Sequence, residues 1–376
     1  MSQRIVVCCD GTWNSHDDPS PTNVFKLRGL VSPVAPDGTT QAVYYDNGVG
    51  TRGGWFRRLV DGATGHGLSE NVREAYRALV DNYDPGDALF FFGFSRGAFT
   101  VRSLGGLIRN CGILRRDRRH LVDDAYALYR DRGESSAPDS DAAKRFRADN
   151  AVEDRTVIEC ISVWDTVGAL GNPMIRHGLV SRRLRFHDVK LSSSVRSAFQ
   201  ALAVDEHRKH FAPSIWEQQE HAAGQVLEQV WFIGAHADVG GGYDSRDLSN
   251  IALEWLVRRA ASRGLAIDER ALEAFVGDGS VRYSSMPHDS QQGFYKLFAP
   301  FDRDVCRSDA DAARARRKKT PVDPATNEAL HWTVVARWKL DLGYRPECLR
   351  RYIAKHPRVL EGDPRDNPVL AAVRPN

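Results

Sequence analysis

The chain has 376 residues, of which 42% are hydrophobic and 27% are charged, and a formal net charge of +3. This composition is ordinary for a globular protein that can bury a substantial core, and the near balance of charge argues against nucleic-acid binding. There is no signal segment at the start and no run of about 18 apolar residues, so we expect a cytoplasmic protein, with export by a dedicated secretion system as the alternative.

The first apolar run, residues 5–9, is followed by a polar loop in the stretch VVCCDGTWN. The Asp-Gly-Thr of this loop resembles half of a phosphatase signature, in which a nucleophilic aspartate lies two residues before the Asp. Position 8 is Cys8, and a neutral thiol buried in a strand cannot replace a metal-bound carboxylate. The sequence therefore disfavours the phosphatase interpretation.

Alternating strand and helix patterns continue along the chain. Apolar runs that indicate strands buried on both faces lie at 5–9, 42–45, 88–94, 157–164 and 226–233, and helical patterns lie at 69–83, 99–108 and 248–261. Ser69 is an imperfect helix cap. This alternation predicts an α/β fold with a doubly wound, mostly parallel sheet.

Two stretches interrupt the alternation. Residues 132–149 are polar and rich in Ser, Ala and Asp, which predicts a surface connection or a mobile excursion, and residues 277–327 are irregular and charged. Neither is rich enough in Pro and Gly to be an interdomain linker. We expect one domain over residues 1–376 with helical or irregular insertions near 113–150 and 277–327, where a cap over the site is one arrangement.

The motif Gly93-Phe94-Ser95-Arg96-Gly97 joins the apolar run at 88–94 to the next helical pattern. Gly-x-Ser-x-Gly between a strand and a helix is the nucleophile elbow of hydrolases, in which the glycines leave room for a tight turn. The hydroxyl is then presented near the positive end of the helix dipole. We therefore predict that Ser95 is a nucleophile, supported by Gly93 and Gly97.

A serine nucleophile needs a base, and the base needs an orienting acid. Asp165 follows the strand pattern at 157–164, and His236 follows the one at 226–233, so both would lie with Ser95 at the carboxyl edge of the sheet. The order Ser, Asp, His is that of an α/β-hydrolase. An alternative role for Asp165 is to cap a helix.

Other residues compete for these roles. His207 and His210 are alternative bases, although no strand pattern leads into them. Asp238 is a supporting residue that orients a base or holds the glycine loop after His236. The cluster at 205–208 is expected to be an ion-paired structural patch or part of the site lining.

An acyl transfer also needs two N–H donors for its oxyanion. We assign the first to Arg96 and the second to Gly11 or Thr12, with Asp10 holding the loop. The alternative is that residues 10–12 form only a turn, in which case the second donor would come from residues 47–50.

Six matching segments make the chain resemble a known family: CCDGTWN, YYDNGVGT, the segment from GHGLSENVREAY through GFSRGAFTVRSL to CGIL, SVWDTVGALG, ALAVDEHRKHFAP and WFIGAHADVGGGYDSRDLSNIALEWL. The chain is similar to the catalytic domains of type VI secretion phospholipase effectors. That resemblance implies an α/β-hydrolase fold with Ser95, Asp165 and His236 as the triad.

The resemblance and the motifs together imply a serine esterase or lipase that cleaves carboxylic esters, leaning to phospholipid or other lipid acyl esters. The expected partners are a lipid or small ester substrate and a transient membrane surface, while any secretion machinery or immunity partner stays unspecified. No cofactor is expected. The six cysteines form no CxxC pair, which argues against a zinc site. The alternative is a hydrolase-fold protein that binds a ligand or partner without turning it over.

Overall fold

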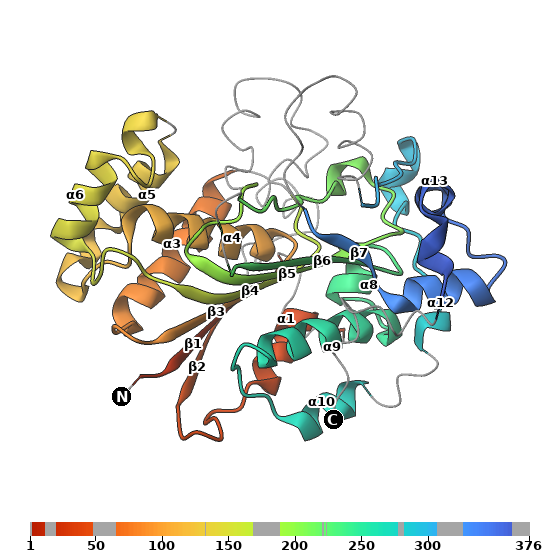
Figure 1. The fold of residues 1–376 in the computed structure, drawn as a ribbon, viewed down its shortest axis with the longest axis horizontal. Helices are drawn as coiled ribbons and strands as arrows, with labels where there is room; N and C mark the ends of the chain where they lie inside the picture. The colour runs from red at the N-terminus through yellow and green to blue at the C-terminus, as the bar shows by residue number, and fades with distance from the viewer. Residues whose placement is uncertain are drawn as a thin grey trace.

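The protein is described by a computed structural model that covers residues 2–11, 20–47, 65–131, 133–167, 189–219, 222, 224–276, 282–306 and 326–362. Its centre is a parallel seven-stranded sheet with the order β2-β1-β3-β4-β5-β6-β7 (Figure 1). The strands are β1 (Arg4–Cys9), β2 (Gln41–Asp46), β3 (Ala88–Phe94), β4 (Ile158–Trp164), β5 (Val195–Ala203), β6 (Val226–Phe232) and β7 (Glu328–Leu330). The fold class is therefore α/β with a doubly wound sheet, as predicted.

The chain changes direction across the sheet at β1. It passes from β1 to β2 on one side and then returns to β3 on the other side, so β1 and β3 are neighbours at a topological switch point. Cys9 pairs with Gly93 in the register of these two strands, which places their carboxyl ends at the same level. Ligands of open α/β sheets bind at such points. Asp10 and Ser95 come directly after the two strands.

Helices cover both faces of the sheet (Figure 1). One face carries α3 (Gly65–Asn82), α4 (Arg96–Cys111), α5 (Val122–Arg130) and α6 (Asp141–Asn150). The other carries α1 (Asn23–Leu30), α8 (His236–Gly240), α9 (Asp247–Ala261) and α10 (Glu269–Val276). Near β7 lie α12 (Trp332–Leu340) and α13 (Glu347–Lys355). The short 3-10 helices are η1 (Arg116–Leu121), η2 (Glu134–Ser136), η3 (Lys209–Phe211), η4 (Arg282–Ser284), η5 (Gly293–Leu297) and η6 (Pro357–Leu360).

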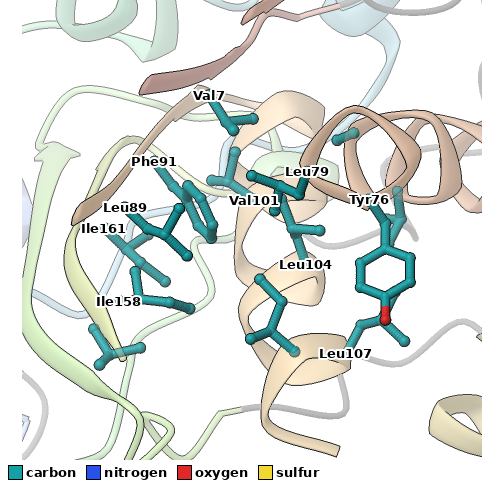
Figure 2. Close-up of a cluster of buried hydrophobic side chains, with 14 of the residues drawn as sticks. Val7, Tyr76, Leu79, Leu89, Phe91, Val101, Leu104, Leu107, Ile158 and Ile161 are labelled. Atoms are coloured by element: carbon teal, nitrogen blue, oxygen red, sulfur yellow. The ribbon is translucent and has the colours of Figure 1, made fainter. Parts of the chain in front are cut away.

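The strands are apolar at every position because each face of the sheet has its own core. Val7 and Phe91 point into the cluster formed with α3 and α4 (Figure 2), whereas Val6 and Phe90 point into the cluster formed with α1 and α9. Successive side chains of a strand alternate between faces, so burial on both sides removes the polar alternation. The continuous runs in the sequence reflect this arrangement.

All five predicted strands are present, but β5 and β7 were missed. β5 has the sequence VRSAFQALA, in which polar residues break the apolar run. The structure gives the buried Gln200 a partner, because Arg102 Nη1 donates to Gln200 Oε1 at 3.1 Å. Satisfied polar side chains of this kind are invisible to a periodicity argument.

One local prediction was wrong: the helix α3 begins at Gly65, so Ser69 lies inside it and is not its cap. The segment near 113–150, where we expected a helical or irregular insertion, contains α6, which begins after Ser140, whose side chain accepts a hydrogen bond from the Ala143 N–H. Arg147 anchors α6, because its guanidinium is buried and donates to the carbonyls of Asn110 and Pro138.

Of the irregular segment 277–327, the structure describes residues 282–306 and 326–327, and the former contain η4 and η5. Across the described ranges, no helix combines the length and the apolar character that crossing a membrane requires. The expectation of one domain with insertions stays a prediction.

Phe91 offers a test of the core between the sheet and α4. Its side chain is completely buried, so Phe91→Ala should lower the free energy of unfolding by about 3–5 kcal/mol, through lost burial and an unfilled cavity. Val34 is 54% exposed, and Val34→Ala is the matched control, which should change stability by less than about 0.5 kcal/mol. Urea unfolding monitored by circular dichroism measures both, and equal effects would contradict this description of the core.

Candidate active site

Ser95 forms a strained turn between β3 and α4. Its backbone has φ 56° and ψ −116°, a region that non-glycine residues rarely adopt. A Cβ on Gly93 would lie 2.5 Å from the Gly97 carbonyl oxygen, and a Cβ on Gly97 would lie 1.9 Å from the Cys9 carbonyl oxygen. Both glycines are therefore required by close backbone approach, which is the physical basis of the Gly-x-Ser-x-Gly spacing.

Asp165 and His236 meet at the same edge of the sheet. Asp165 follows β4 with φ 37°, and His236 is the first residue of α8, which follows β6. The Asp165 Oδ2 lies 2.6 Å from His236 Nδ1, and both side chains are buried. The Ala203 N–H donates to the other carboxylate oxygen at 3.1 Å. This is the geometry of a base held by an orienting acid.

Phe94, the residue before Ser95, packs its ring against His236. The Phe94 ring centroid lies 4.6 Å from that of His236. A Cβ on Gly240 would lie 1.9 Å from Phe94, so the glycine allows this close packing. The Ser95 Oγ makes no hydrogen bond with any residue that the structure describes. The structure thus brings Asp165 and His236 into contact and leaves the serine hydroxyl without a bond to the base.

Arg303 is a site residue that sequence reasoning missed. Its Nη1 and Nη2 donate to Asp165 Oδ1 and Oδ2 at 2.7 and 2.9 Å, and neither side chain has any exposed surface. Burial by itself would raise the pKa of the Asp165 carboxyl, but Arg303 and His236 outweigh it and hold that pKa well below its usual range. Arg303 lies in the segment predicted only as irregular, and no local pattern marks it.

The environment of His236 favours its neutral form. Burial lowers the pKa of the His236 imidazole, and the opposing effect of Asp165 only partly offsets this. Phe211 packs edge-on against the ring at 5.0 Å between centroids. An imidazole that is neutral near pH 7 is able to accept a proton, as a general base must.

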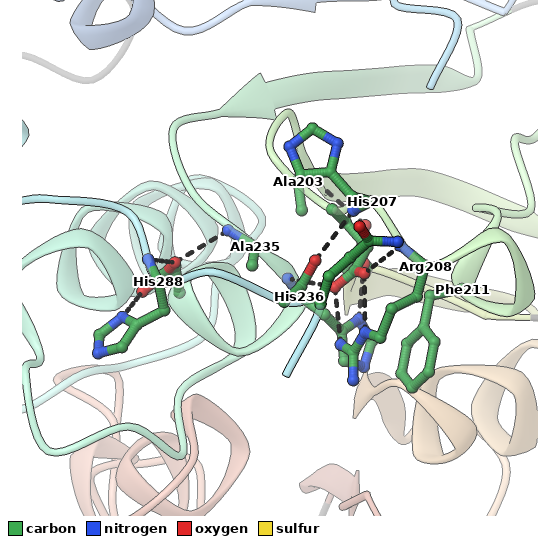
Figure 3. A network of polar contacts seen from close by, with 12 residues as sticks. Ala203, His207, Arg208, Phe211, Ala235, His236 and His288 are labelled. Carbon is green, nitrogen blue, oxygen red and sulfur yellow. Dashed lines mark hydrogen bonds and ion pairs between the residues drawn. The ribbon is translucent and has the colours of Figure 1, made fainter. Parts of the chain in front are cut away.

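Three carboxylates hold the turn that carries His236. Figure 3 shows Ala235, His236, Arg208 and His288 in the polar network around this turn. The backbone N–H groups of three successive residues, 234 to 236, donate to Asp205 Oδ2 at 2.6 Å, Asp238 Oδ2 at 2.9 Å and Glu206 Oε2 at 3.2 Å. A side chain that accepts a backbone N–H at a helix start fixes the direction of the chain there. The cluster at 205–208 and Asp238 therefore act on the backbone around His236.

Glu206 and Asp238 each have a second partner. Arg208 donates to both oxygens of Glu206 from Nε and Nη2, at 2.8 and 2.7 Å. Asp238 Oδ1 lies 2.6 Å from Nδ1 of His288, which stacks on Tyr243 at 3.9 Å between centroids. The ion pair expected in the cluster at 205–208 is thus present.

The two alternative bases lie apart from Asp165. His207 Nδ1 is 3.6 Å from Asp302 Oδ1, and the His210 ring packs against Phe298 at 5.8 Å. Within the described ranges, neither histidine contacts Asp165. The geometry of the site therefore favours His236 over both.

Asp10 organises the loop after β1. Its Oδ2 accepts from Thr22 Oγ1 at 2.5 Å and from the Tyr45 hydroxyl at 2.8 Å, and its Oδ1 accepts from the Gly11 N–H at 2.7 Å. A Cβ on Gly11 would lie 3.6 Å from Ser95 Cβ, so this loop adjoins the nucleophile elbow. The bond to Asp10 occupies the Gly11 N–H and leaves Thr12 as the candidate donor of this loop. Thr12 and residues 48–50 lie outside the described residues.

The structure also bears on the phosphatase interpretation. Cys8 is completely buried in β1, and burial raises the pKa of its thiol far above the usual range. The thiol is therefore neutral and unable to act as a nucleophile. Among the described residues, no group of three His, Cys, Asp or Glu side chains is placed to hold a metal ion.

Gly97 provides a test of the elbow. A methyl group there meets backbone atoms of Cys9, which cannot move without disturbing the sheet, so Gly97→Ala should lower the free energy of unfolding by more than about 2 kcal/mol. Gly29, inside α1, has no atom within 4 Å of an added Cβ, and Gly29→Ala should be neutral or stabilising. Thermal unfolding measures both changes, and a neutral Gly97→Ala would refute the close approach.

Comparison with known proteins gives the chain a family and a set of relatives. The YEL023C protein of Saccharomyces cerevisiae is 26% identical over 227 residues, which are 56% of this chain and 32% of that protein. This chain thus spans about one third of that relative's length.

Two solved structures share a TM-score of 0.40 with this chain. A Pseudomonas aeruginosa protein is 14% identical, with 99% of this chain and 64% of that chain covered. The Tle1 effector bound to the VgrG spike of the type 6 secretion system is 16% identical, with 76% of this chain and 81% of that chain covered. A family model, that of the catalytic domain of Tle1-like phospholipase effectors of type VI secretion, matches residues 3–259. The chain therefore belongs to this family of Tle1-like phospholipase effector catalytic domains.

Proposed function

We propose that this protein is a serine hydrolase that cleaves carboxylic esters with Ser95 as nucleophile, His236 as base and Asp165 as orienting acid. One observation carries the proposal: a serine in a strained elbow lies at the same sheet edge as a buried Asp–His pair. The elbow exposes a nucleophile, and the pair supplies a base with its tautomer fixed, because Asp165 accepts the proton on Nδ1.

In the proposed reaction His236 Nε2 takes the proton of the Ser95 hydroxyl while Oγ attacks the ester carbonyl carbon. The resulting oxyanion is bound by the Arg96 N–H and by a second donor for which Thr12 is our candidate. Arg96 is the first residue of α4, where backbone N–H groups have no partner within the helix. His236 then protonates the leaving alcohol as the carbon–oxygen bond breaks. Water, deprotonated by His236, releases the acyl group and restores Ser95.

Membership in the family supports a lipid acyl ester as substrate, with phospholipid as the leading class. A protein that cleaves such substrates must meet a membrane surface at least transiently. We extend the proposal to a cytoplasmic location before export, with secretion machinery as a partner. That extension is supported by the family description, which refers to secreted effectors.

One observation favours a second candidate function. The Ser95 hydroxyl has no hydrogen bond to His236, as would suit a hydrolase-fold protein that binds a ligand without turnover. Many hydrolases close this bond only when substrate is present, so turnover remains the first proposal. The experiment below separates the two.

The triad predicts loss of reactivity in two variants. The parent protein should react with a fluorophosphonate probe and hydrolyse p-nitrophenyl or phospholipid esters, and Ser95→Ala should abolish both because the proposed reaction then lacks its nucleophile. Asp165→Asn should keep the fold but lower kcat by roughly 10³–10⁴, because the Nδ1 proton then has no anionic acceptor. Mass spectrometry of the labelled protein and ester kinetics measure these effects. A folded parent protein that neither labels nor turns over any ester would support the binding function.

The depressed pKa of His236 predicts the pH dependence. The base must be neutral, so kcat/KM should fall as the pH drops through the pKa of His236, which lies below the ordinary value of 6.5. The midpoint of the acidic limb should therefore lie below pH 6.5, and activity should level off as the pH rises toward 8. Ester hydrolysis across pH 4–9 tests this, and a midpoint above 6.5 would contradict the environment described for His236.

A further inference from the structure

Arg303 and Asp165 form an ion pair unlike the others around buried arginines. The pair of Arg147 with Asp154, for example, leaves the carboxylate 72% exposed, whereas neither side chain of the Arg303–Asp165 pair has any exposed surface. Removing two charges from water costs several kcal/mol per ion unless geometry and hydrogen bonds compensate. Here both oxygens of the Asp165 carboxylate have partners, so its charge is compensated inside the protein. This arrangement suggests that the pair has a role in the site as well as in stability.

Every contact of Asp165 restricts the direction in which its carboxylate faces. Oδ1 accepts from Arg303 Nη1 and from the Ala203 N–H, and Oδ2 accepts from Arg303 Nη2 and meets His236 Nδ1. A guanidinium fork binds both oxygens in one plane. The carboxylate therefore cannot rotate without breaking two charged bonds, and Oδ2 stays directed at His236.

The same guanidinium also holds the surroundings of the pair. Arg303 Nη1 donates to the Ala203 carbonyl at 2.8 Å, and Nη2 donates to the Phe211 carbonyl at 2.5 Å. Phe211 is the residue whose ring packs edge-on against His236. One side chain thus fixes the acid, the end of β5 and one wall of the imidazole.

We propose that Arg303 is a positioning residue of the triad, which keeps the Asp165 carboxylate ionised and directed at His236. The proposal rests on the proposed function of the Ser95–His236–Asp165 site, because positioning matters only if His236 acts as a base. Arg303 itself touches neither the serine nor, by this proposal, the substrate.

Loss of Arg303 has a definite consequence for ionisation. Without the guanidinium, the buried negative charge of Asp165 keeps only His236 and the Ala203 N–H as partners, so the Asp165–His236 pair binds a proton at higher pH. The other charged groups that act on the His236 imidazole are Arg208, which lowers its pKa, and Glu206, which raises it, and these two are bonded to each other. Nearby Asp238 is bonded to the Ala235 N–H and to His288. The bonds of these groups do not involve Arg303, although Glu206 also loses a nearby positive charge when Arg303 is replaced.

The test compares two variants with the parent protein. Arg303→Met removes the charge at similar volume, and Arg303→Lys keeps the charge but loses the fork. Arg147→Met is the matched control, because Arg147 is another buried arginine with carbonyl and carboxylate partners, in α6 and away from the site. Two quantities are measured from pH 4 to 9: the rate of fluorophosphonate labelling, and the NMR titration of the His236 imidazole, identified by its loss in His236→Gln.

In Arg303→Met, both midpoints should rise by about 1 pH unit, and labelling on the plateau should slow by roughly tenfold or more. In Arg303→Lys, the midpoints should stay near those of the parent while labelling slows, because one ammonium cannot hold both oxygens. Arg147→Met should lower the melting temperature without moving either midpoint. If Arg303 had only a structural role, Arg303→Met would behave like Arg147→Met: the melting temperature would fall and neither midpoint would move.

Unshifted midpoints in a folded Arg303→Met protein would overturn the proposal. Labelling of Arg303→Lys at the rate of the parent protein would also overturn it. If Arg303→Met does not fold, the labelling rate of Arg303→Lys decides the matter. Failure of the proposed function looks different. In that case the parent itself does not label, while the NMR titration still reports whether Arg303 controls the ionisation of the pair.

Discussion

A carboxylate with no exposed surface is the constraint on which the rest of the site depends. Asp165 can remain charged at the end of β4 only if other parts of the chain bring it donors. Those donors come from the end of β5, from α8 and from residue 303, which lie up to 138 positions from Asp165 in sequence. The fold around the site is therefore organised by the need to satisfy one buried charge.

The second constraint is close backbone approach at the switch point between β1 and β3. Glycines at 93 and 97 let α4 start directly against the end of β1, and Gly240 lets α8 pack on Phe94. Larger side chains at these positions would separate the elements that carry Ser95 and His236. The same glycines that make a tight sheet edge thus bring Ser95 and His236 into one neighbourhood.

The acids around His236 have separate tasks. Asp165 meets the imidazole itself, whereas Asp205, Glu206 and Asp238 accept backbone N–H groups of the turn that carries it. Arg208 neutralises Glu206, so this additional carboxylate adds little net charge beside His236. In this way the turn is held rigidly, and Asp165 is the carboxylate that is bonded to the imidazole itself.

The sequence by itself determined the doubly wound sheet, the elbow at Ser95 and the strand ends that carry Asp165 and His236. These follow from local patterns, because burial on both faces makes strands apolar and tight turns require glycine. Only the tertiary structure decided the partners of the site. Strand β5 was hidden by polar residues whose partners lie far away, Arg303 lay in a segment without periodicity, and the Gly11 N–H proved to be occupied by Asp10. Such contacts depend on side chains distant in sequence meeting in space, and no local spacing encodes that meeting.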